Sequence, residues 1–132
     1  MYALGIDGGG SRTRALLCDA YGQIIGQGIS GGTNPRTSST AELKAHLQEA
    51  IEQATRSIDC SKIIAAHFGL AGAGEADTRA RVSTITKELL GKQTACTIGH
   101  DLEIALAGGL ANKTGIVLVA GTGSACYGRT CD

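Results

Sequence analysis

Residues 2–19 read Tyr-Ala-Leu-Gly-Ile-Asp-Gly-Gly-Gly-Ser-Arg-Thr-Arg-Ala-Leu-Leu-Cys-Asp, and this stretch decides the fold. An apolar run ends at Asp7, a glycine-rich loop follows, and a second extended run covers 13–19. A Walker A loop would need a lysine here. A dinucleotide fingerprint, Gly-x-Gly-x-x-Gly, would need a glycine at position 13, where this chain has Thr13, and would open a helix. The segment after the loop has no helix cap and soon meets a turn signal at 19–22. It therefore predicts a strand, and the loop is expected to be the tip of a β-hairpin.

The rest of the sequence extends this hairpin into a mixed α/β layer. A third strand is expected over 23–29, which makes an antiparallel meander. Ser39 and Glu42 form a capping box, and apolar residues then recur at helical spacing as far as Ile58. The later elements are expected to be a strand at 62–70, a helix from a cap at Asp77 to Leu90, a strand at 94–98, a helix from Asp101 to Leu110, and strands at 115–120 and 125–129. Parallel strands require crossover connections, and the expected helices lie where crossovers belong.

Composition and charge argue against several classes of protein. The chain has 132 residues, enough for one compact domain, with 12 Lys and Arg against 12 Asp and Glu. A net charge of zero without a basic run argues against a nucleic-acid surface. The sequence contains neither a secretory apolar region nor the ~20 apolar residues that a membrane helix needs. The five cysteines form no Cys-x-x-Cys pair, so we expect reduced thiols and a cytoplasmic protein.

The first glycine loop is a candidate anion site. Successive backbone N–H groups form a concavity that binds phosphate, and glycine lets the phosphate come close. Ser11 and Thr13 add hydroxyl donors, whereas the carboxylate of Asp7 would repel phosphate unless a cation lies between them. We therefore expect Asp7 to hold Mg²⁺ through water. The alternative is a tight glycine hairpin in which Asp7 only stabilises the turn.

A second loop of the same kind lies near the end of the sequence. Gly121-Thr122-Gly123-Ser124 follows an apolar strand and again offers backbone amides and hydroxyls. A simple hairpin turn is the alternative for this loop as well. Two such loops in one chain nevertheless favour a pair of clamps for one polyphosphate.

Two polar residues between the loops, Asp101 and Asn34, are further candidates. Asp101 follows a strand and precedes a helix, so it is an N-cap, a general base that takes a proton from an attacking hydroxyl, or both. Asn34 could orient a polyol hydroxyl or form an Asn-Pro turn. The histidines at 46 and 67 fit structural roles within a helix and a strand, and the role of His100 stays open.

Together these residues resemble the sugar-kinase, heat-shock-chaperone and actin superfamily of two-domain ATPases. Within it, the chain looks like the BadF/BadG/BcrA/BcrD family, which includes N-acetylglucosamine kinase and bacterial glucosamine kinase. Nearly the whole chain is covered. Segments 5–13 and 120–124 are similar to the family's two phosphate motifs, 32–34 to its sugar-contacting loop, 69–74 to a small-residue loop, and 100–109 to the segment with the catalytic Asp.

The resemblance implies a ribonuclease H-like fold in each of two lobes, with ATP in the cleft and a sugar beside it. This chain would be an actin-like ATPase lobe, a mixed sheet whose three antiparallel strands continue into parallel strands, with helices on both faces. Asp101 becomes the base for the sugar hydroxyl and Asn34 a sugar ligand, while Thr122 and Gly123 border both sugar and phosphates. The residues expected to bind ATP are Gly8, Gly9, Gly10, Ser11, Arg12, Thr13, Gly121, Thr122, Gly123 and Ser124, with Asp7 on Mg²⁺.

The sequence departs from the family pattern because it ends at Asp132, just after the second phosphate motif. We expect residues 1–112 to form the N-terminal lobe, residues 113–132 to open a second lobe, and the chain alone to have negligible kinase activity. The expected function is ATP-dependent phosphorylation of an amino sugar or N-acetylated sugar. The alternatives are the ATPase activator of a 2-hydroxyacyl-CoA dehydratase and a non-catalytic nucleotide-binding module. Expected partners are the sugar and ATP, without nucleic acid or membrane, and a homodimer is one assembly to consider.

Overall fold

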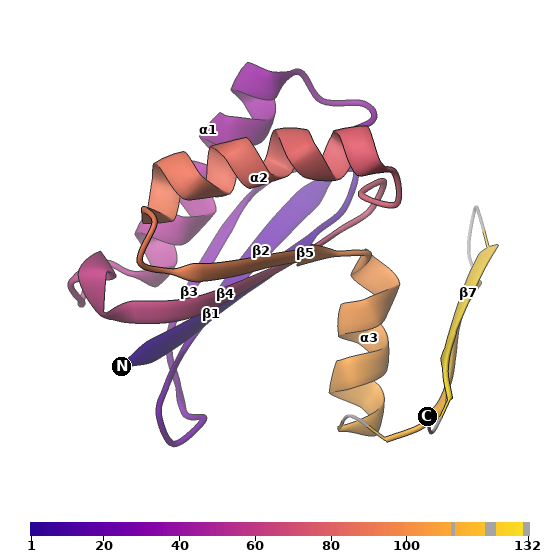
Figure 1. Ribbon diagram of the computed structural model, residues 1–132. Helices are drawn as coiled ribbons and strands as arrows, with labels where there is room; N and C mark the ends of the chain where they lie inside the picture. The colour runs from indigo at the N-terminus through magenta and orange to yellow at the C-terminus, as the bar shows by residue number, and fades with distance from the viewer. Residues whose placement is uncertain (112, 121–123, 131–132) are drawn as a thin grey trace.

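The computed structural model describes residues 1–111, 113–120 and 124–130 (Figure 1). A five-stranded sheet has the order β3-β2-β1-β4-β5, and β6 and β7 form a separate two-stranded sheet. The strands are β1 (Tyr2–Gly8), β2 (Arg12–Asp19), β3 (Ile24–Gly31), β4 (Ile63–Leu70), β5 (Ala95–Gly99), β6 (Gly115–Ala120) and β7 (Ser124–Arg129). The helices are α1 (Thr40–Ala54), α2 (Ala76–Leu90) and α3 (Asp101–Leu110), with a short 3₁₀ turn at Cys60–Lys62.

The strand pairing confirms the predicted change from antiparallel to parallel. β1 pairs antiparallel with β2, and β2 pairs antiparallel with β3. β4 is parallel to β1 on its other side, and β5 is parallel to β4. Gly8 lies opposite Thr13, so the first glycine loop is the tip of a β-hairpin as predicted.

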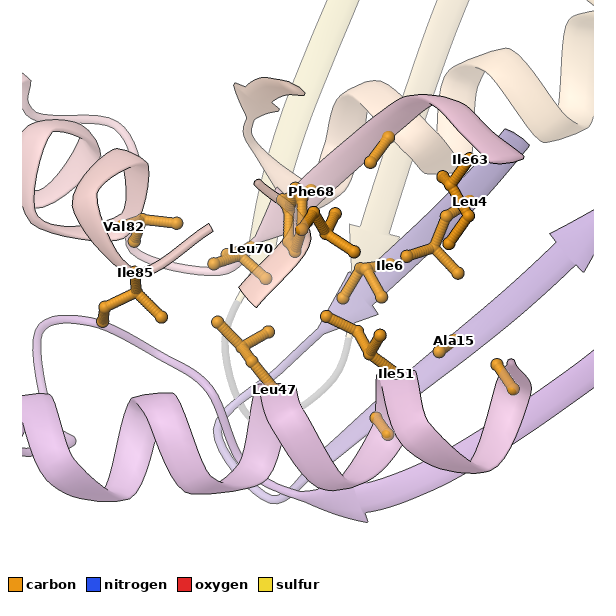
Figure 2. Close-up of a cluster of buried hydrophobic side chains, with 14 of the residues drawn as sticks. Leu4, Ile6, Ala15, Leu47, Ile51, Ile63, Phe68, Leu70, Val82 and Ile85 are labelled. Atoms are coloured by element: carbon orange, nitrogen blue, oxygen red, sulfur yellow. The ribbon is translucent and has the colours of Figure 1, made fainter. Parts of the chain in front are cut away.

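Helices cover both faces of the main sheet, as Figure 1 shows: α1 and α2 lie on one face and α3 on the other. The core lies under α1 and α2, where Ile6 and Phe68 of the sheet are fully buried close to Leu47 and Ile51 of α1 (Figure 2). Burial of one such side chain stabilises a fold by about 1.5–3 kcal/mol. No helix among the described residues has both the length and the apolar character needed to cross a membrane.

Helix α1 approaches β3 unusually closely. A Cβ atom on Gly26 would overlap the backbone oxygen of Ala54, and one on Gly28 would overlap that of Ala50. Both alanines are buried. Glycine on the strand and alanine on the helix therefore allow backbone-to-backbone packing at this edge of the sheet.

The helix starts confirm one predicted cap and correct two. The Ser39 side chain accepts from the Glu42 N–H, and the Glu42 side chain accepts from the Ser39 N–H, which completes the predicted capping box. Helix α2 begins two residues earlier than predicted, with Glu75 at the N-cap, so Asp77 is not the cap and lies in the first turn. Helix α3 has His100 at its N-cap, so Asp101 is the first helical residue. An acidic residue in a first turn is still favoured by the helix dipole, and a sequence signal cannot separate these positions.

We predict that Gly28→Ala lowers the free energy of unfolding by roughly 1–3 kcal/mol, because the new methyl group forces α1 away from β3. Thermal and urea unfolding of the chain measure this loss. Gly109→Ala is the matched control, since a Cβ there meets nothing within 4 Å. Alanine is the better helix former, so the control is expected to be neutral or stabilising. Equal stability of the two variants would contradict the close packing.

The capping box predicts a pH dependence. Hydrogen bonds from the Ser39 side chain and backbone hold the pKa of Glu42 below its ordinary value. The ionised form is the bonded one, so its stabilisation is complete above the ordinary glutamate pKa and is lost as pH falls through the lowered pKa. Glu42→Gln should therefore lower the melting temperature at neutral pH and have a smaller effect below about pH 4.

The control for this pH effect is Glu52→Gln, which removes the same charge from the last turn of α1. A negative charge is not favoured at that end of a helix. Melting curves of the control should show no stability loss that appears only at neutral pH. A pH-independent effect of Glu42→Gln would contradict the capping mechanism.

Candidate active site

The first glycine loop is held on both sides by neighbouring segments. The Gly9 N–H donates to the Arg12 carbonyl (2.9 Å), which closes the hairpin tip. The Gly9 carbonyl accepts from the Thr33 N–H (2.9 Å), and the Gly8 carbonyl accepts from the Ala71 N–H (2.8 Å). The loop is therefore fixed to the predicted sugar-contacting loop and to the 69–74 segment.

The surface of this loop carries hydrogen-bond donors. Among the described residues, no acceptor is found for the backbone N–H groups of Gly10 and Ser11. The side chains of Ser11 and Arg12 are exposed. A cleft of about 360 Å³ is lined by Asp7, Gly9, Ser11, Arg12 and Arg14. Free amides and cationic side chains beside a glycine loop are the chemistry that binds phosphate.

Thr13 differs from this expectation because its side chain is fully buried. Its hydroxyl donates to the Gly31 carbonyl (2.7 Å) and lies 2.8 Å from the Thr33 hydroxyl. The Thr13 hydroxyl therefore joins the hairpin to the 31–33 segment, and only Ser11 offers a hydroxyl on the surface of the loop. Side chains alternate between the two faces of β2, and Thr13 lies on the buried face together with Ala15 and Leu17.

Sequence analysis missed Arg14 as a lining residue. It lies opposite Asp7 in the β1–β2 register, and both side chains are exposed. Residues at alternate positions of a strand share a face, so Arg14 follows Arg12 toward the cleft. That alternation, together with the hairpin register, could have identified Arg14 from the sequence.

A row of paired residues crosses the sheet from Asp7 in β1 toward Asp101. Gly69 of β4 is the register partner of Asp7 in β1, and Gly99 of β5 is the register partner of Gly69. Two strand spacings separate the ends of this row, about 10 Å. Asp101 follows Gly99 by two residues, at the start of α3. The carboxyl ends of the three parallel strands thus bring the two predicted aspartates to one edge of the sheet.

The start of α3 is fixed tightly. The Leu102 N–H donates to Oδ1 of Asp101 (3.0 Å), and the His100 N–H donates to Glu103 Oε1 (3.3 Å). A Cβ on Gly69 would overlap the Ile104 side chain, so the absence of a side chain lets α3 lie directly on β4. The Asp101 side chain keeps 33% of its surface exposed. An oriented, solvent-accessible carboxylate is what a general base requires.

Asn34 forms the predicted turn and also lies near the candidate site. Its Oδ1 accepts from the Arg36 N–H (2.9 Å), and its carbonyl accepts from the Ser38 N–H (3.0 Å). Among the described residues, its side-chain N–H₂ group has no acceptor. Asn34 lies against Gly72, which has a φ of +83° and no room for a Cβ beside Asn34 Oδ1. The turn is confirmed, and a sugar-binding role for the amide stays a prediction.

The second phosphate motif lies largely outside the described residues. This applies to Gly121, Thr122 and Gly123, whereas Ser124 begins β7 with its side chain exposed. Helix α3 contacts both β6 and β7. A cleft of about 310 Å³ lies between β7 and the starts of α2 and α3, and its lining includes Gly74, Arg79, His100, Cys126 and Tyr127.

The histidines at 46 and 67 have partners within the protein, as their predicted structural roles require. His46 Nδ1 lies 2.8 Å from the Gly32 carbonyl, and His67 Nδ1 lies 2.8 Å from the Thr97 hydroxyl. In the described part of the chain, no three His, Cys, Asp or Glu side chains are grouped as metal ligands. Burial raises the pKa of the Cys96 thiol, which makes it a poor nucleophile at neutral pH.

Comparisons with known proteins identify the family of this chain. The model of the BadF/BadG/BcrA/BcrD ATPase family matches residues 4–130. The chain is 34% identical, over 133 residues, to an N-acetylmuramic acid/N-acetylglucosamine kinase of Clostridium acetobutylicum, covering 97% of this chain and 42% of that protein. It is 28% identical, over 135 residues, to an N-acetyl-D-glucosamine kinase of Dictyostelium discoideum, covering 95% of this chain and 42% of that protein.

The solved structure of a candidate N-acetylglucosamine kinase from Porphyromonas gingivalis has a TM-score of 0.79 and 20% identity. The match covers 97% of this chain and 44% of that one. This likeness concerns the fold, and it confirms the predicted mixed α/β, ribonuclease H-like fold. The chain spans 42% of the length of the curated relatives it matches. Because the family model covers nearly all of its residues, the chain belongs to the BadF/BadG/BcrA/BcrD ATPase family.

Proposed function

We propose that this chain provides the first phosphate loop, a sugar ligand and the general base of an ATP-dependent kinase for an amino sugar or N-acetylated sugar. One observation carries the proposal. The glycine loop, Asn34 and Asp101 converge at one edge of the sheet, in a chain 34% identical to an N-acetylmuramic acid/N-acetylglucosamine kinase. Phosphoryl transfer depends mainly on positioning and charge stabilisation, and this edge offers both.

ATP fits the first loop as its phosphate ligand. The amides of Gly10 and Ser11 point to no other described acceptor, and Arg12 and Arg14 add positive charge. We propose that Gly8–Thr13 and Gly121–Ser124 hold the phosphates from two sides, with the Thr13 side chain acting as a buried support. Residues 1–112 would then be one lobe, and 113–132 the opening hairpin of a second.

Mg²⁺ fits beside Asp7. The ion usually keeps several waters and takes one or two carboxylates plus substrate phosphates. The exposed carboxylate of Asp7 lies beside the phosphate loop and suits such a site. The described residues contain no group of three or more His, Cys, Asp or Glu side chains that could bind a metal without water or phosphate. When bound, Mg²⁺ would neutralise phosphate charge next to a carboxylate that otherwise repels it.

The four described cysteines are free thiols, which supports a cytoplasmic location.

The proposed reaction uses Asp101 and Asn34 on the sugar. The Asn34 amide would orient the sugar, and the Asp101 carboxylate would accept the proton of the attacking hydroxyl. The hydroxyl oxygen bonds to the γ-phosphorus of ATP as the bond to the β–γ bridging oxygen breaks, which releases ADP. A positioned base of this kind contributes typically about 10²–10⁴-fold to the rate.

The first test of function is Asp101→Asn in the full-length gene product. We expect ATP-dependent phosphorylation of glucosamine, N-acetylglucosamine or N-acetylmuramic acid by the unchanged protein. The variant should lose about 10²–10⁴-fold in kcat, with little change in KM for ATP, because only the base is removed. Coupled ADP release and mass analysis of the sugar phosphate measure both quantities.

Asp77→Asn is the control for this test. It makes the same change in the first turn of α2, at an exposed position outside the cleft residues. Its activity should equal that of the unchanged protein. Full turnover by Asp101→Asn, or no sugar-dependent ADP release at all, would refute the proposed function.

The second test concerns the first phosphate loop. A Cβ on Gly10 meets nothing within 4 Å, so Gly10→Ala should fold normally while its methyl group blocks close approach of a phosphate. We expect the Kd for ATP, measured by calorimetry on the full-length protein, to rise about 10-fold or more, or about 1.4 kcal/mol per decade. Gly5→Ala is the control, because its Cβ position is equally open but lies within β1. Equal ATP affinities of the two variants would show that the loop amides do not bind phosphate.

A further inference from the structure

The residue before the proposed base is a histidine whose ring reaches that base. His100 lies between the end of β5 and the start of α3, with an extended backbone at φ −81° and ψ 150°. Its Nδ1 atom lies 2.5 Å from Oδ1 of Asp101. The Nδ1 atom is buried and makes no hydrogen bond within the described residues: it lies at ion-pair distance from Oδ1, but the ring is not aligned for a hydrogen bond to it. Of the His100 side chain as a whole, 38% is exposed.

The two oxygens of the Asp101 carboxylate are therefore not equivalent. Oδ1 accepts from the Leu102 N–H (3.0 Å) and faces His100 Nδ1. Among the described residues, no hydrogen bond is made to Oδ2. Oδ1 thus carries one hydrogen bond and one close ring contact, and rotation about the Cβ–Cγ bond would break both, so the carboxylate is oriented.

The histidine is itself held in place by its surroundings. Its backbone N–H donates to Glu103 Oε1 (3.3 Å), and its carbonyl accepts from the Glu103 N–H (3.0 Å). Its ring lies beside Gly74, where a Cβ would be 3.8 Å from His100 Cδ2. The ring therefore stands between the 69–74 segment and the first turn of α3, at the wall of the 310 Å³ cleft.

We propose that His100 is a positioning residue for the base. A small rotation of the ring aligns Nδ1–H with Oδ1 of Asp101, and the hydrogen bond so formed leaves Oδ2 to receive the proton of the sugar hydroxyl. This inference rests on the proposed function of Asp101 and adds a second residue to it. The imidazole touches neither sugar nor ATP in this role and acts only through the carboxylate. A base that is misplaced by 1 Å can lose about 10²-fold in rate.

The kinetic test uses His100→Leu and His100→Asn in the full-length protein. Leucine removes the donor, whereas the side-chain amide of asparagine places an N–H₂ group close to the position of Nδ1. We expect His100→Leu to lower kcat by roughly 10- to 100-fold with KM for ATP unchanged. His100→Asn should recover most of this loss. Thermal unfolding of both variants separates the effect on rate from any loss of stability.

A double-mutant cycle with Asp101→Asn makes the test specific to the base. If His100 acts through the carboxylate, His100→Leu should have no further effect once Asp101 is an asparagine. A structural role would instead lower the residual rate by the same factor in both backgrounds. Equal factors in the two backgrounds overturn the inference.

A second readout works on the 132-residue chain itself. The ¹⁵N chemical shifts of the His100 ring report which nitrogen carries the proton. We expect the Nδ1–H tautomer in the unchanged chain and loss of that preference in Asp101→Asn, since the tautomer is fixed by the hydrogen bond that the ring makes. An Nε2–H tautomer in the unchanged chain would overturn the inference.

The outcomes separate the two claims. If Asp101→Asn abolishes turnover while His100→Leu is fully active, the inference fails and the proposed function stands. If Asp101→Asn is fully active, the proposed function fails, and the inference fails with it whatever the tautomer. Support requires a kcat loss in His100→Leu, rescue by asparagine, non-additivity and the Nδ1–H tautomer.

Discussion

Close packing of neighbouring side chains against glycines near the carboxyl ends of the parallel strands is the constraint on which the rest of the structure depends. A Cβ on one glycine near the end of each strand would overlap a neighbouring side chain: that of Thr33 at Gly8 in β1, that of Ile104 at Gly69 in β4 and that of Glu103 at Gly99 in β5. The first lets the 32–34 segment and β4 close on the hairpin tip, and the other two let the first turn of α3 lie on the sheet. Larger residues there would separate the segments that carry the candidate site.

Much of the fold could be predicted from the sequence because its signals are local. Alternating apolar residues, the turn after Asp19 and the Ser39 capping box each depend on neighbours in the chain. The errors are also local, since Asp77 and Asp101 lie within first turns instead of at caps. Aspartate is favourable at both kinds of position, so its identity alone does not fix the helix start.

The candidate site was less accessible to sequence reasoning. The residues of the first loop, Asn34 and Asp101 stand out individually, but their convergence depends on strand register, which is set by contacts distant in sequence. Alternation along β2 would have separated the buried Thr13 from Arg12 and Arg14. The contact between His100 and Asp101 depends on side-chain rotamers at a helix start, and no spacing rule gives those.

The β6–β7 hairpin has a consequence for handling the chain in solution. In the described part of the chain, its two strands pair only with each other, and Ile116 and Leu118 are 73% and 70% exposed. Unpaired strand edges that carry apolar side chains recruit further strands. At the concentrations used for crystallisation or magnetic resonance, the 132-residue chain should therefore self-associate. This association should begin at the β6–β7 hairpin while the main sheet stays folded.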